Sequence, residues 1–324
     1  ALDPVLGELI LRPDFTAPVA RLHLARLAEG APAEAPTLYR YAGPVFRASV
    51  PGAARPNEYL QAGIELIGPR DPAQADVEIF ALLRRALGPL AATARATLGD
   101  LAVAFAAIDG LTAPERWKAA LRRRLWRPAA FRRRLAEMAP YRPAPTETRA
   151  ALLAAVRSPD PDSAVLSGRA RPEGARAPQD VAARARELAE DAGHALPAEQ
   201  AAWLSQVLAV VGPADAALAR LRSLDRDAAL SAALDRLETR FHALSAAGAA
   251  PEGMVFDASF GRSLEYYDGF VFEFALPDAP HLPPLAGGGR YDALLARLGG
   301  PAGLPAIGGI VRPEALLAAR EAAS

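Results

Sequence analysis

The chain has 324 residues, of which 51% are hydrophobic and 23% charged, and this is enough for a large core or for one large domain with a smaller one. Its 37 basic residues equal its 37 acidic residues, so no overall basic field indicates nucleic-acid binding. The chain has no cysteine, which excludes a disulfide framework, a thiolate zinc site and a thiol nucleophile and fits a reducing compartment. The four histidines lack metal-ligand spacing, no apolar run reaches membrane-spanning length, and no signal peptide leads the chain. We therefore expect a cytoplasmic protein that needs no metal or cofactor and binds neither nucleic acid nor membrane.

Strands and helices are expected to alternate over the first 110 residues. The expected strands are residues 9–13, 38–48, 58–68 and 102–108. The expected helices are residues 17–28, which Asp14 or Thr16 can cap, and residues 72–90, which Asp71 can cap. Only a short loop separates the second and third strands, so we expect them to form an antiparallel pair.

From residue 111 the pattern becomes helical, and strands return only near residue 253. The expected helices are 114–126, 128–139, 147–157, 178–193, 197–210, 213–223, 226–246, 290–298 and 313–322, and the later strands are 254–260, 266–276 and 305–311. Strand-rich ends around a helical middle predict an α+β fold. In it, residues 1–110 and 250–324 form a discontinuous core, and residues 111–249 form an inserted helical subdomain.

Residues 115–134 are strongly basic, with nine Lys or Arg and a single acid. Such a run is either the solvated face of surface helices or a surface that contacts RNA or another partner.

Residues 257–273 carry more polar groups than a buried strand tolerates. The stretch reads DASFGRSLEYYDGFVFE and places Arg262, Tyr266 and Tyr267 among β-favouring residues. Burying such groups is costly unless they meet partners or a ligand. The stretch is therefore either a strand that floors a polar pocket or an edge strand with a solvated polar face.

Several separated parts of the chain carry similar polar residues where a core strand is normally apolar. The candidate site residues are Asp14, Thr16, Arg47, Gln61, Glu65, Arg262, Tyr266, Tyr267 and Tyr291. Each has a simpler explanation alone, such as a helix cap, an edge salt bridge or a surface arginine. Together they could hold a zwitterionic amino acid, with carboxylates for its ammonium group, an arginine for its carboxylate and tyrosines around its side chain.

The glycine run 287–289 lacks the lysine and serine of a phosphate-binding loop. We interpret it as a place where the backbone approaches closely in front of a helix that carries Tyr291.

These residues also lie in four separated motifs that resemble histidyl-tRNA synthetases. The motifs are LRPDFT at 11–16, GPVFR at 43–47 with EYLQAGIE at 58–65, GRSLEYY at 261–267, and GGRYD at 288–292 with PAIG at 305–308. Their order and the spacing from Arg47 to Gln61 and Glu65 agree with that family. The resemblance implies a class II aminoacyl-tRNA synthetase-like core, with a six-stranded antiparallel sheet flanked by helices, in a protein that is usually dimeric.

The chain departs from the synthetase pattern at several places. Ala315 stands where the family has an arginine that binds the ATP tail, and Ser49 replaces an acid that reads adenine. No anticodon-binding domain follows the last motif, and the first class II motif, expected before Leu2, does not appear. The residues for histidine are thus largely kept, whereas those for ATP are altered.

This combination resembles the regulatory subunit of ATP phosphoribosyltransferase. The resemblance implies a non-catalytic chain that is needed, with the short-form catalytic subunit, for the first step of histidine biosynthesis and its feedback inhibition. It further implies a homodimer within a hetero-octamer, and free histidine as a candidate ligand.

Two other functions stay open from the sequence. One is a stand-alone histidyl-tRNA synthetase-like paralogue that activates or ligates an amino acid and binds ATP through Arg47, Arg55 and Arg312. The other is an RNA-binding module that uses residues 115–134.

Overall fold

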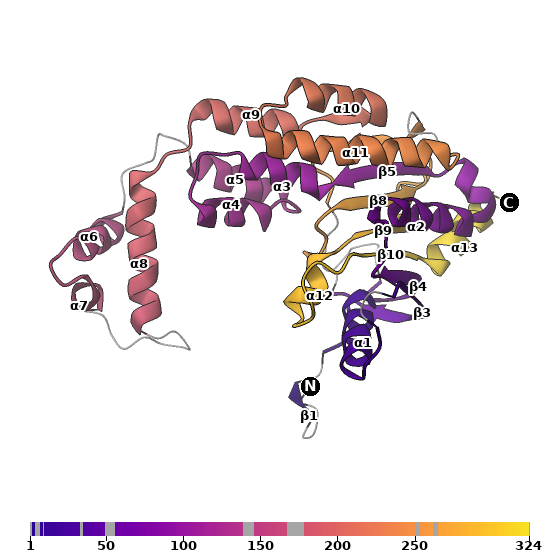
Figure 1. Cartoon of the computed structure of the whole chain (residues 1–324), viewed down its shortest axis with the longest axis horizontal. Coiled ribbons are helices and arrows are strands. Elements are labelled where there is room, and N and C mark those ends of the chain that lie inside the picture. Colours follow the sequence, from indigo (N-terminus) through magenta and orange to yellow (C-terminus); the bar gives the residue numbers. More distant parts are fainter. Residues whose placement is uncertain are drawn as a thin grey trace. The chain divides into compact units, whose positions relative to one another are not determined.

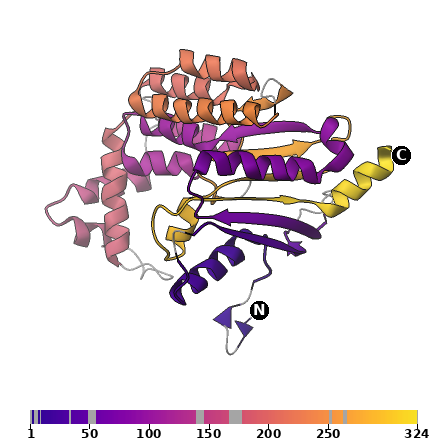
Figure 2. The same cartoon turned by 45° about the vertical axis from the view of Figure 1, so that its right-hand side comes forward.

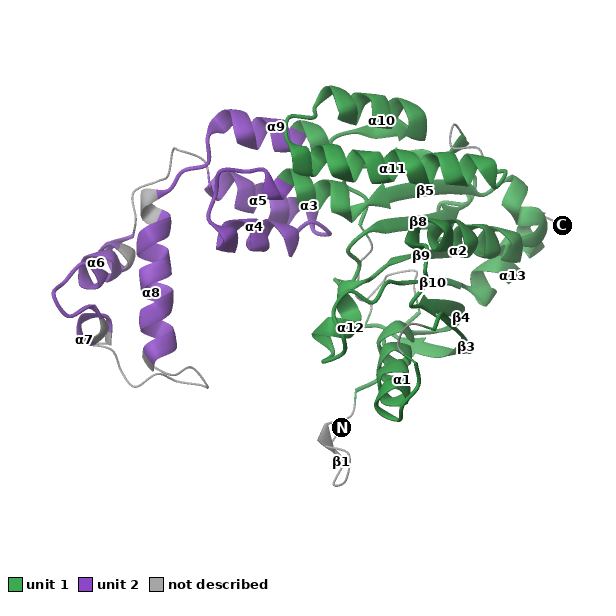
Figure 3. Cartoon of the chain, viewed as in Figure 1, with its two compact units in different colours: residues 1–107, 206–324 green, residues 108–205 purple. Residues whose placement is uncertain are grey.

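Two compact units make up the chain (Figure 3). The computed structural model describes residues 2–3, 7–8, 10–32, 35–48, 56–138, 146–166, 178–249, 253–261 and 265–323. Unit 1 combines residues 1–107 with residues 206–324, and unit 2 is residues 108–205. The helical region expected at 111–249 is therefore divided, because its last part belongs to unit 1.

An eight-stranded sheet forms the centre of unit 1 (Figures 1 and 2). Its strands in spatial order are β3 (Thr37–Phe46), β4 (Glu58–Ile67), β10 (Ala306–Val311), β9 (Ala286–Arg290), β8 (Phe270–Ala275), β5 (Arg95–Asp100), β7 (Val255–Asp257) and β6 (Val211–Pro213). All neighbouring pairs are antiparallel except β5 and β7. The predicted α+β class is confirmed, but the sheet has eight strands and one parallel pair where six antiparallel strands were expected. A separate antiparallel pair joins β1 (Leu2–Asp3) and β2 (Gly7–Glu8).

The hairpin of β3 and β4 confirms the antiparallel pair predicted from the sequence. Its register places Tyr39 opposite Glu65 and Tyr41 opposite Gly63. Residues directly opposite one another share a face of the sheet, and faces alternate along each strand. The register therefore puts these tyrosines on the same face as Glu65.

Helices cover the sheet of unit 1. They are α1 (Thr16–Ala28), α2 (Pro72–Ala86), the 3₁₀ helix η1 (Gly88–Ala92), α10 (Ala214–Ser223), α11 (Ala228–Ala246), α12 (Ala293–Arg297) and α13 (Pro313–Ala323). Helix α2 lies across β8, β9 and β10 (Figure 1), and Asp71 caps it as predicted, by accepting from the backbone N–H of Gln74 at 3.0 Å. Phe80 of α2 packs its ring against those of Phe272 and Phe274, with ring centroids 5.1 and 4.9 Å apart.

The buried strand predicted at 102–108 is wrong, since these residues lie in helix α3 (Leu101–Asp109). A short apolar run cannot distinguish a buried strand from a buried helix by its period. Four of these seven residues are alanine, which favours a helix, and Asp100 accepts from the backbone N–H of Ala102 at 2.9 Å in the first turn. The neighbouring strand is instead β5, which ends at Asp100.

Buried ion pairs explain why α11 belongs to unit 1. Arg240 of α11 donates to Asp76 of α2 at 2.7 Å and to Asp100 of β5 at 2.6 Å. Arg290 of β9 also donates to Asp76, at 2.6 Å, and to Asp292 at 2.9 Å. Asp76 is fully buried, so each charge in the network depends on its partners.

Unit 2 is helical in the part that the structure describes. Its helices are α4 (Glu115–Arg122), α5 (Pro128–Glu137), α6 (Glu147–Val156), α7 (Pro161–Leu166), α8 (Pro178–Gly193) and most of α9 (Ala198–Leu208). Asp191 of α8 accepts from the indole N–H of Trp117 at 2.5 Å and pairs with Arg116 at 2.6 Å, which fastens α8 to α4. Among the described helices of the chain, none is long and apolar enough to cross a membrane.

Candidate functional site

The site is built around Glu65, a buried carboxyl group near the end of β4 that is 1% exposed. One of its oxygens, Oε1, accepts from the hydroxyl groups of Thr16 at 2.8 Å and of Tyr41 at 2.9 Å. The other, Oε2, accepts from the hydroxyl group of Tyr291 at 2.6 Å. Residues from α1, β3 and β4 and the residue that follows β9 therefore meet at one carboxyl group.

Burial raises the pKa of Glu65 to about 7, because desolvation penalises the charged carboxylate. The hydrogen bonds from Tyr291, Thr16 and Tyr41 favour the charged form and lower the pKa, but less strongly. Near neutral pH the group therefore exists in both protonation states. A cationic group that replaced the proton would find three donors already holding the carboxylate in place.

Glycines on neighbouring strands leave the room that this carboxyl group occupies. Gly308 of β10 lies opposite Glu65, and a Cβ atom there would be 1.6 Å from Oε2 of Glu65. A Cβ atom at Gly289 of β9 would be 2.9 Å from the ring of Tyr267. The predicted close backbone approach at the glycine run is confirmed, because a Cβ atom at Gly288 would lie 2.3 Å from the carbonyl oxygen of Gly308. The run itself forms strand β9, which the sequence pattern did not predict, and Tyr291 precedes helix α12 (Ala293–Arg297) although a helix was expected to carry it.

A second carboxyl group, that of Asp14, lies beside the first. Asp14 is buried and accepts from the backbone N–H of Thr16 at 3.0 Å. Tyr266 donates to Thr16 Oγ1 at 3.2 Å and to Asp14 Oδ2 at 3.5 Å, so Thr16 links the two carboxyl groups. Burial raises the pKa of Asp14, while the backbone N–H of Ala17 and the charge of Arg47 lower it.

Arg47 follows β3 and lies near Asp14. Its Nε donates to the backbone carbonyl of Pro13 at 2.9 Å, and its guanidinium lies 5.8 Å from the ring centre of Tyr59. It thus places a guanidinium group beside the carboxyl group of Asp14.

Three tyrosine rings form one wall of the site. The ring centres of Tyr266 and Tyr267 are 4.6 Å apart, and those of Tyr266 and Tyr291 are 5.9 Å apart in an edge-on arrangement. Tyr266 and Tyr267 lie in the turn before β8, not within a strand. The interpretation of 257–273 as a polar strand is therefore wrong in its secondary structure, although its tyrosines do face the polar residues of the site.

Gln61 lies on the same face of β4 as Glu65 and is 2% exposed. Its Oε1 is buried and has no hydrogen-bond partner in the part of the chain that the structure describes. Buried amide oxygens are usually paired, so this acceptor is available to a ligand.

Six of the nine predicted site residues are thus linked by hydrogen bonds or ring contacts: Asp14, Thr16, Glu65, Tyr266, Tyr267 and Tyr291. Arg47 lies beside Asp14, and Gln61 shares the strand face without a hydrogen bond to the cluster among the described residues. Arg262, together with Ser49 and Arg55, lies outside the described residues.

Tyr41 also belongs to the site, although it was not among the residues predicted from the sequence. The register of the hairpin could have identified it, because Tyr41 lies opposite Gly63 and therefore on the sheet face that carries Glu65. A Cβ atom at Gly63 would lie 2.5 Å from the hydroxyl group of Tyr41, so glycine is required for the tyrosine to lie there.

Ala315, the residue that stands for the expected ATP-binding arginine, lines a separate hollow of about 380 Å³. The hollow is lined by Pro56, Tyr59, Pro280, His281, Leu282, Pro283, Arg312, Glu314, Ala315 and Ala318. Arg312 is buried, and its Nη1 donates to the carbonyl oxygen of Pro284. Its guanidinium is thus bonded to the protein's own backbone.

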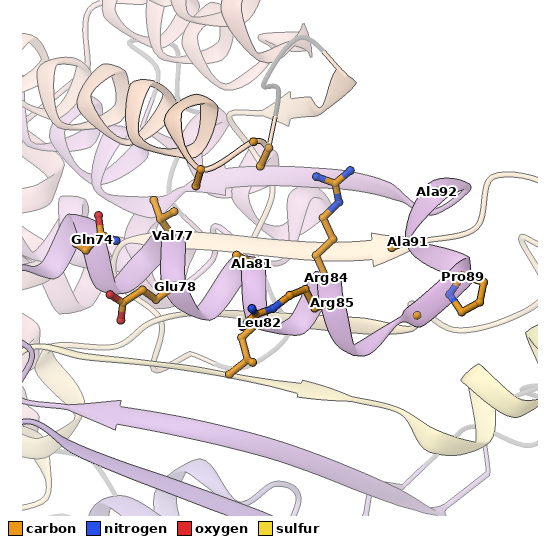
Figure 4. Close-up of a pocket in the computed structure, with 14 residues that line it drawn as sticks. Gln74, Val77, Glu78, Ala81, Leu82, Arg84, Arg85, Pro89, Ala91 and Ala92 are labelled. Atoms are coloured by element: carbon orange, nitrogen blue, oxygen red, sulfur yellow. The ribbon is translucent and has the colours of Figure 1, made fainter.

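A larger groove of about 990 Å³ follows helix α2 and η1 to the end of α11 (Figure 4). Gln74, Glu78 and Arg85 of α2 line it, and none of the predicted site residues does. The described residues also contain no group of three or more histidine, aspartate or glutamate side chains placed to hold a metal ion.

The raised pKa of Glu65 predicts a pH-dependent stability. Between about pH 4.5, its usual pKa, and about pH 7, the folded protein holds a proton that the unfolded chain has released. We expect the free energy of unfolding to fall as the pH rises through this window, and this fall to be smaller in Glu65→Gln. Urea unfolding of both proteins across the window measures it, and equal pH dependence in the two would contradict the assignment.

Sequence relatives agree with the fold. The family model of histidyl-tRNA synthetase matches residues 3–195 and 183–316. The chain is 37% identical to the ATP phosphoribosyltransferase regulatory subunit of Mesorhizobium japonicum, over 97% of this chain and 84% of that protein. It is 36% identical to the subunit of the same name from Brucella anthropi, over 93% and 81% of the two chains.

Solved structures give the same result. An ATP phosphoribosyltransferase regulatory subunit/histidyl-tRNA synthetase from Bacillus halodurans has a TM-score of 0.66 at 25% identity, over 98% of this chain and 67% of that one. A histidyl-tRNA synthetase from Nostoc has a TM-score of 0.58 at 17% identity, over 99% and 62% of the two chains, and shows the fold alone.

The sheet, the glycine-floored site and the family match define a class II synthetase-like protein of the histidyl-tRNA synthetase type. Within that class, the chain belongs to the family of ATP phosphoribosyltransferase regulatory subunits.

Proposed function

We propose that the chain binds free histidine at the Glu65 site and transmits its presence to a short-form ATP phosphoribosyltransferase catalytic subunit. In this role it performs no chemistry itself. It is needed for the catalytic subunit's activity in the first step of histidine biosynthesis, and histidine bound to it inhibits that activity. A ligand can do this only if it binds the active and inactive states of the complex with different affinities.

The observation that carries the proposal is the donor and acceptor set around Glu65. Two buried carboxyl groups, Glu65 and Asp14, suit a cationic ammonium or imidazolium group, and Arg47 beside Asp14 suits a carboxylate. The unpartnered Oε1 of Gln61 supplies one more acceptor. Tyrosine rings beside them suit a flat side chain.

The hollow at Ala315 supports a role without ATP chemistry. Two alanines and three prolines form half of its lining, and its arginine, Arg312, donates to the carbonyl oxygen of Pro284. A triphosphate would need cationic partners there, and the loss of one such buried contact costs about 2–5 kcal/mol of binding. This observation disfavours the alternative of an amino-acid-activating paralogue.

The outer edge of the sheet supports association into the homodimer within a hetero-octamer that we expect. Leu38 of β3 and Leu60 of β4 share one sheet face and are 60% and 43% exposed. Leu22 of α1 is also exposed, at 52%. Exposed large apolar side chains on an edge strand and the elements beside it are typical of a surface that another chain covers. A cytoplasmic location, where the enzymes of amino-acid biosynthesis work, is part of the same proposal.

Co-expression with a short-form catalytic subunit tests the regulatory role. We expect the two chains to purify together as a hetero-octamer, and phosphoribosyltransferase activity to require both. We expect the purified chain alone to show no histidine-dependent exchange of pyrophosphate into ATP. Robust exchange, or failure of the two chains to associate, would overturn the proposal.

A further inference from the structure

A second hollow lies wholly within unit 2, between helices α4, α5 and α8. Its volume is about 460 Å³, which is in the range of small-molecule sites. It is lined by Arg116, Ala119, Ala120, Arg123, Arg124, Ala130, Arg133, Arg134, Glu137, Arg184, Glu187 and Asp191. The alanines of α4 and α5 leave this space open, because a longer side chain in their place would extend into it.

The wall carries six arginines and three carboxylates, a net charge of three positive. The carboxylates are engaged by three of the arginines. Arg116 pairs with Asp191 at 2.6 Å, Arg134 of α5 pairs with Glu137 at 3.1 Å, and Arg184 of α8 pairs with Glu187 at 2.6 Å. These pairs hold part of the wall and neutralise half of its arginines.

The other three arginines, Arg123, Arg124 and Arg133, account for the excess charge. Within the described ranges of the chain none of them forms an ion pair with a carboxylate, and Arg124 donates to the backbone carbonyl of Ala120 at 2.9 Å. Arg123 ends α4 and Arg133 lies in α5, so guanidinium groups from two helices border one hollow. Like charges placed together repel one another unless an anion joins them.

We infer that this hollow binds a small anion with two or more phosphate groups. One guanidinium group can donate two parallel hydrogen bonds to the oxygens of a phosphate group. A di- or triphosphate also carries enough negative charge to match the excess of three positive charges in the wall. A single carboxylate would leave most of that excess unmatched.

A small anion fits this hollow better than a nucleic-acid strand does. These three arginines border one hollow of limited volume, whereas a nucleic-acid strand needs basic groups along its length. Glu137 and Glu187 lie in the same wall and would repel a continuous phosphate backbone that passed over it.

Calorimetry with sodium tripolyphosphate on the full chain tests the inference. The test variant is Arg123→Gln with Arg133→Gln. The control is Arg132→Gln, an exposed arginine of the same helix α5 that does not line the hollow. We expect saturable binding at low salt, unchanged in the control and weakened more than about tenfold in the double variant, which corresponds to the loss of at least one charged contact. Circular dichroism checks that all variants fold.

Three results would overturn the inference. One is the absence of saturable tripolyphosphate binding. Another is equal weakening in the control and the double variant, which would indicate general charge attraction. The third is binding of a short single-stranded RNA without binding of tripolyphosphate, which would assign the arginines to a nucleic-acid surface.

Discussion

Replacing Glu65 by glutamine is expected to weaken histidine binding by at least about 2 kcal/mol, or about thirtyfold in the dissociation constant. Glutamine has nearly the same shape, and hydroxyl groups can donate or accept, so the contacts with Thr16, Tyr41 and Tyr291 can persist. What the substitution removes is the negative charge that a cationic ligand would pair with. Calorimetric titration with free histidine near neutral pH measures the change.

The matched control for this experiment is Glu58→Gln. Glu58 lies at the start of the same strand, and it is exposed where Glu65 is buried. We expect this variant to bind histidine as the natural protein does. Equal weak binding to all three proteins would mean that the site does not recognise histidine through Glu65.

Replacing Asp76 by alanine is expected to lower the free energy of unfolding of unit 1 by about 3–5 kcal/mol. Asp76 is fully buried and accepts from both Arg240 and Arg290. Its removal leaves two buried guanidinium groups with one partner fewer each, although Asp100 and Asp292 remain. A substitution that removes the partner of a buried charge leaves that charge uncompensated, and its effect on stability is among the largest that a single substitution produces.

Asp235→Ala on helix α11 is the control for that measurement. Asp235 pairs with Arg222 at 2.6 Å but is largely exposed, so we expect a change of about 0–1 kcal/mol. The three tryptophans, Trp117, Trp126 and Trp203, all lie in unit 2, and their fluorescence therefore reports that unit. Because Asp76 lies in unit 1, urea unfolding should be followed by circular dichroism, which also registers the helices and strands of that unit. Similar stability of the two variants would contradict the role given to the buried network.

The strongest local patterns in the sequence were sufficient to predict much of the fold. The β3–β4 hairpin and the Asp71-capped helix both follow from alternation, helical spacing and a capping residue, all read within a few neighbours. The strand predicted at 102–108 was wrong because the period of a short apolar run does not distinguish a helix from a strand. The assignment of α11 to unit 1 depends on Arg240 and Asp76, which are 164 residues apart and have no local signal.

The candidate site was predictable as a set of residue types, but its geometry was not. Asp14, Glu65, Tyr266 and Tyr291 come from separated stretches; their residue types indicated an amino-acid site, and the family resemblance supported grouping them. Tyr41 escaped notice because only the hairpin register shows that it faces Glu65. The raised pKa of Glu65 likewise comes from complete burial, which depends on strands that are distant in the sequence.

The proposal that the Glu65 site senses histidine is tested most directly in the assembled enzyme. Phosphoribosyltransferase activity should be measured with and without histidine, in complexes that contain either the natural chain or Glu65→Gln. We expect histidine to inhibit the natural complex, and the Glu65→Gln complex to stay active at the same histidine concentration. Equal inhibition of the two complexes would contradict the proposal and place the feedback site elsewhere.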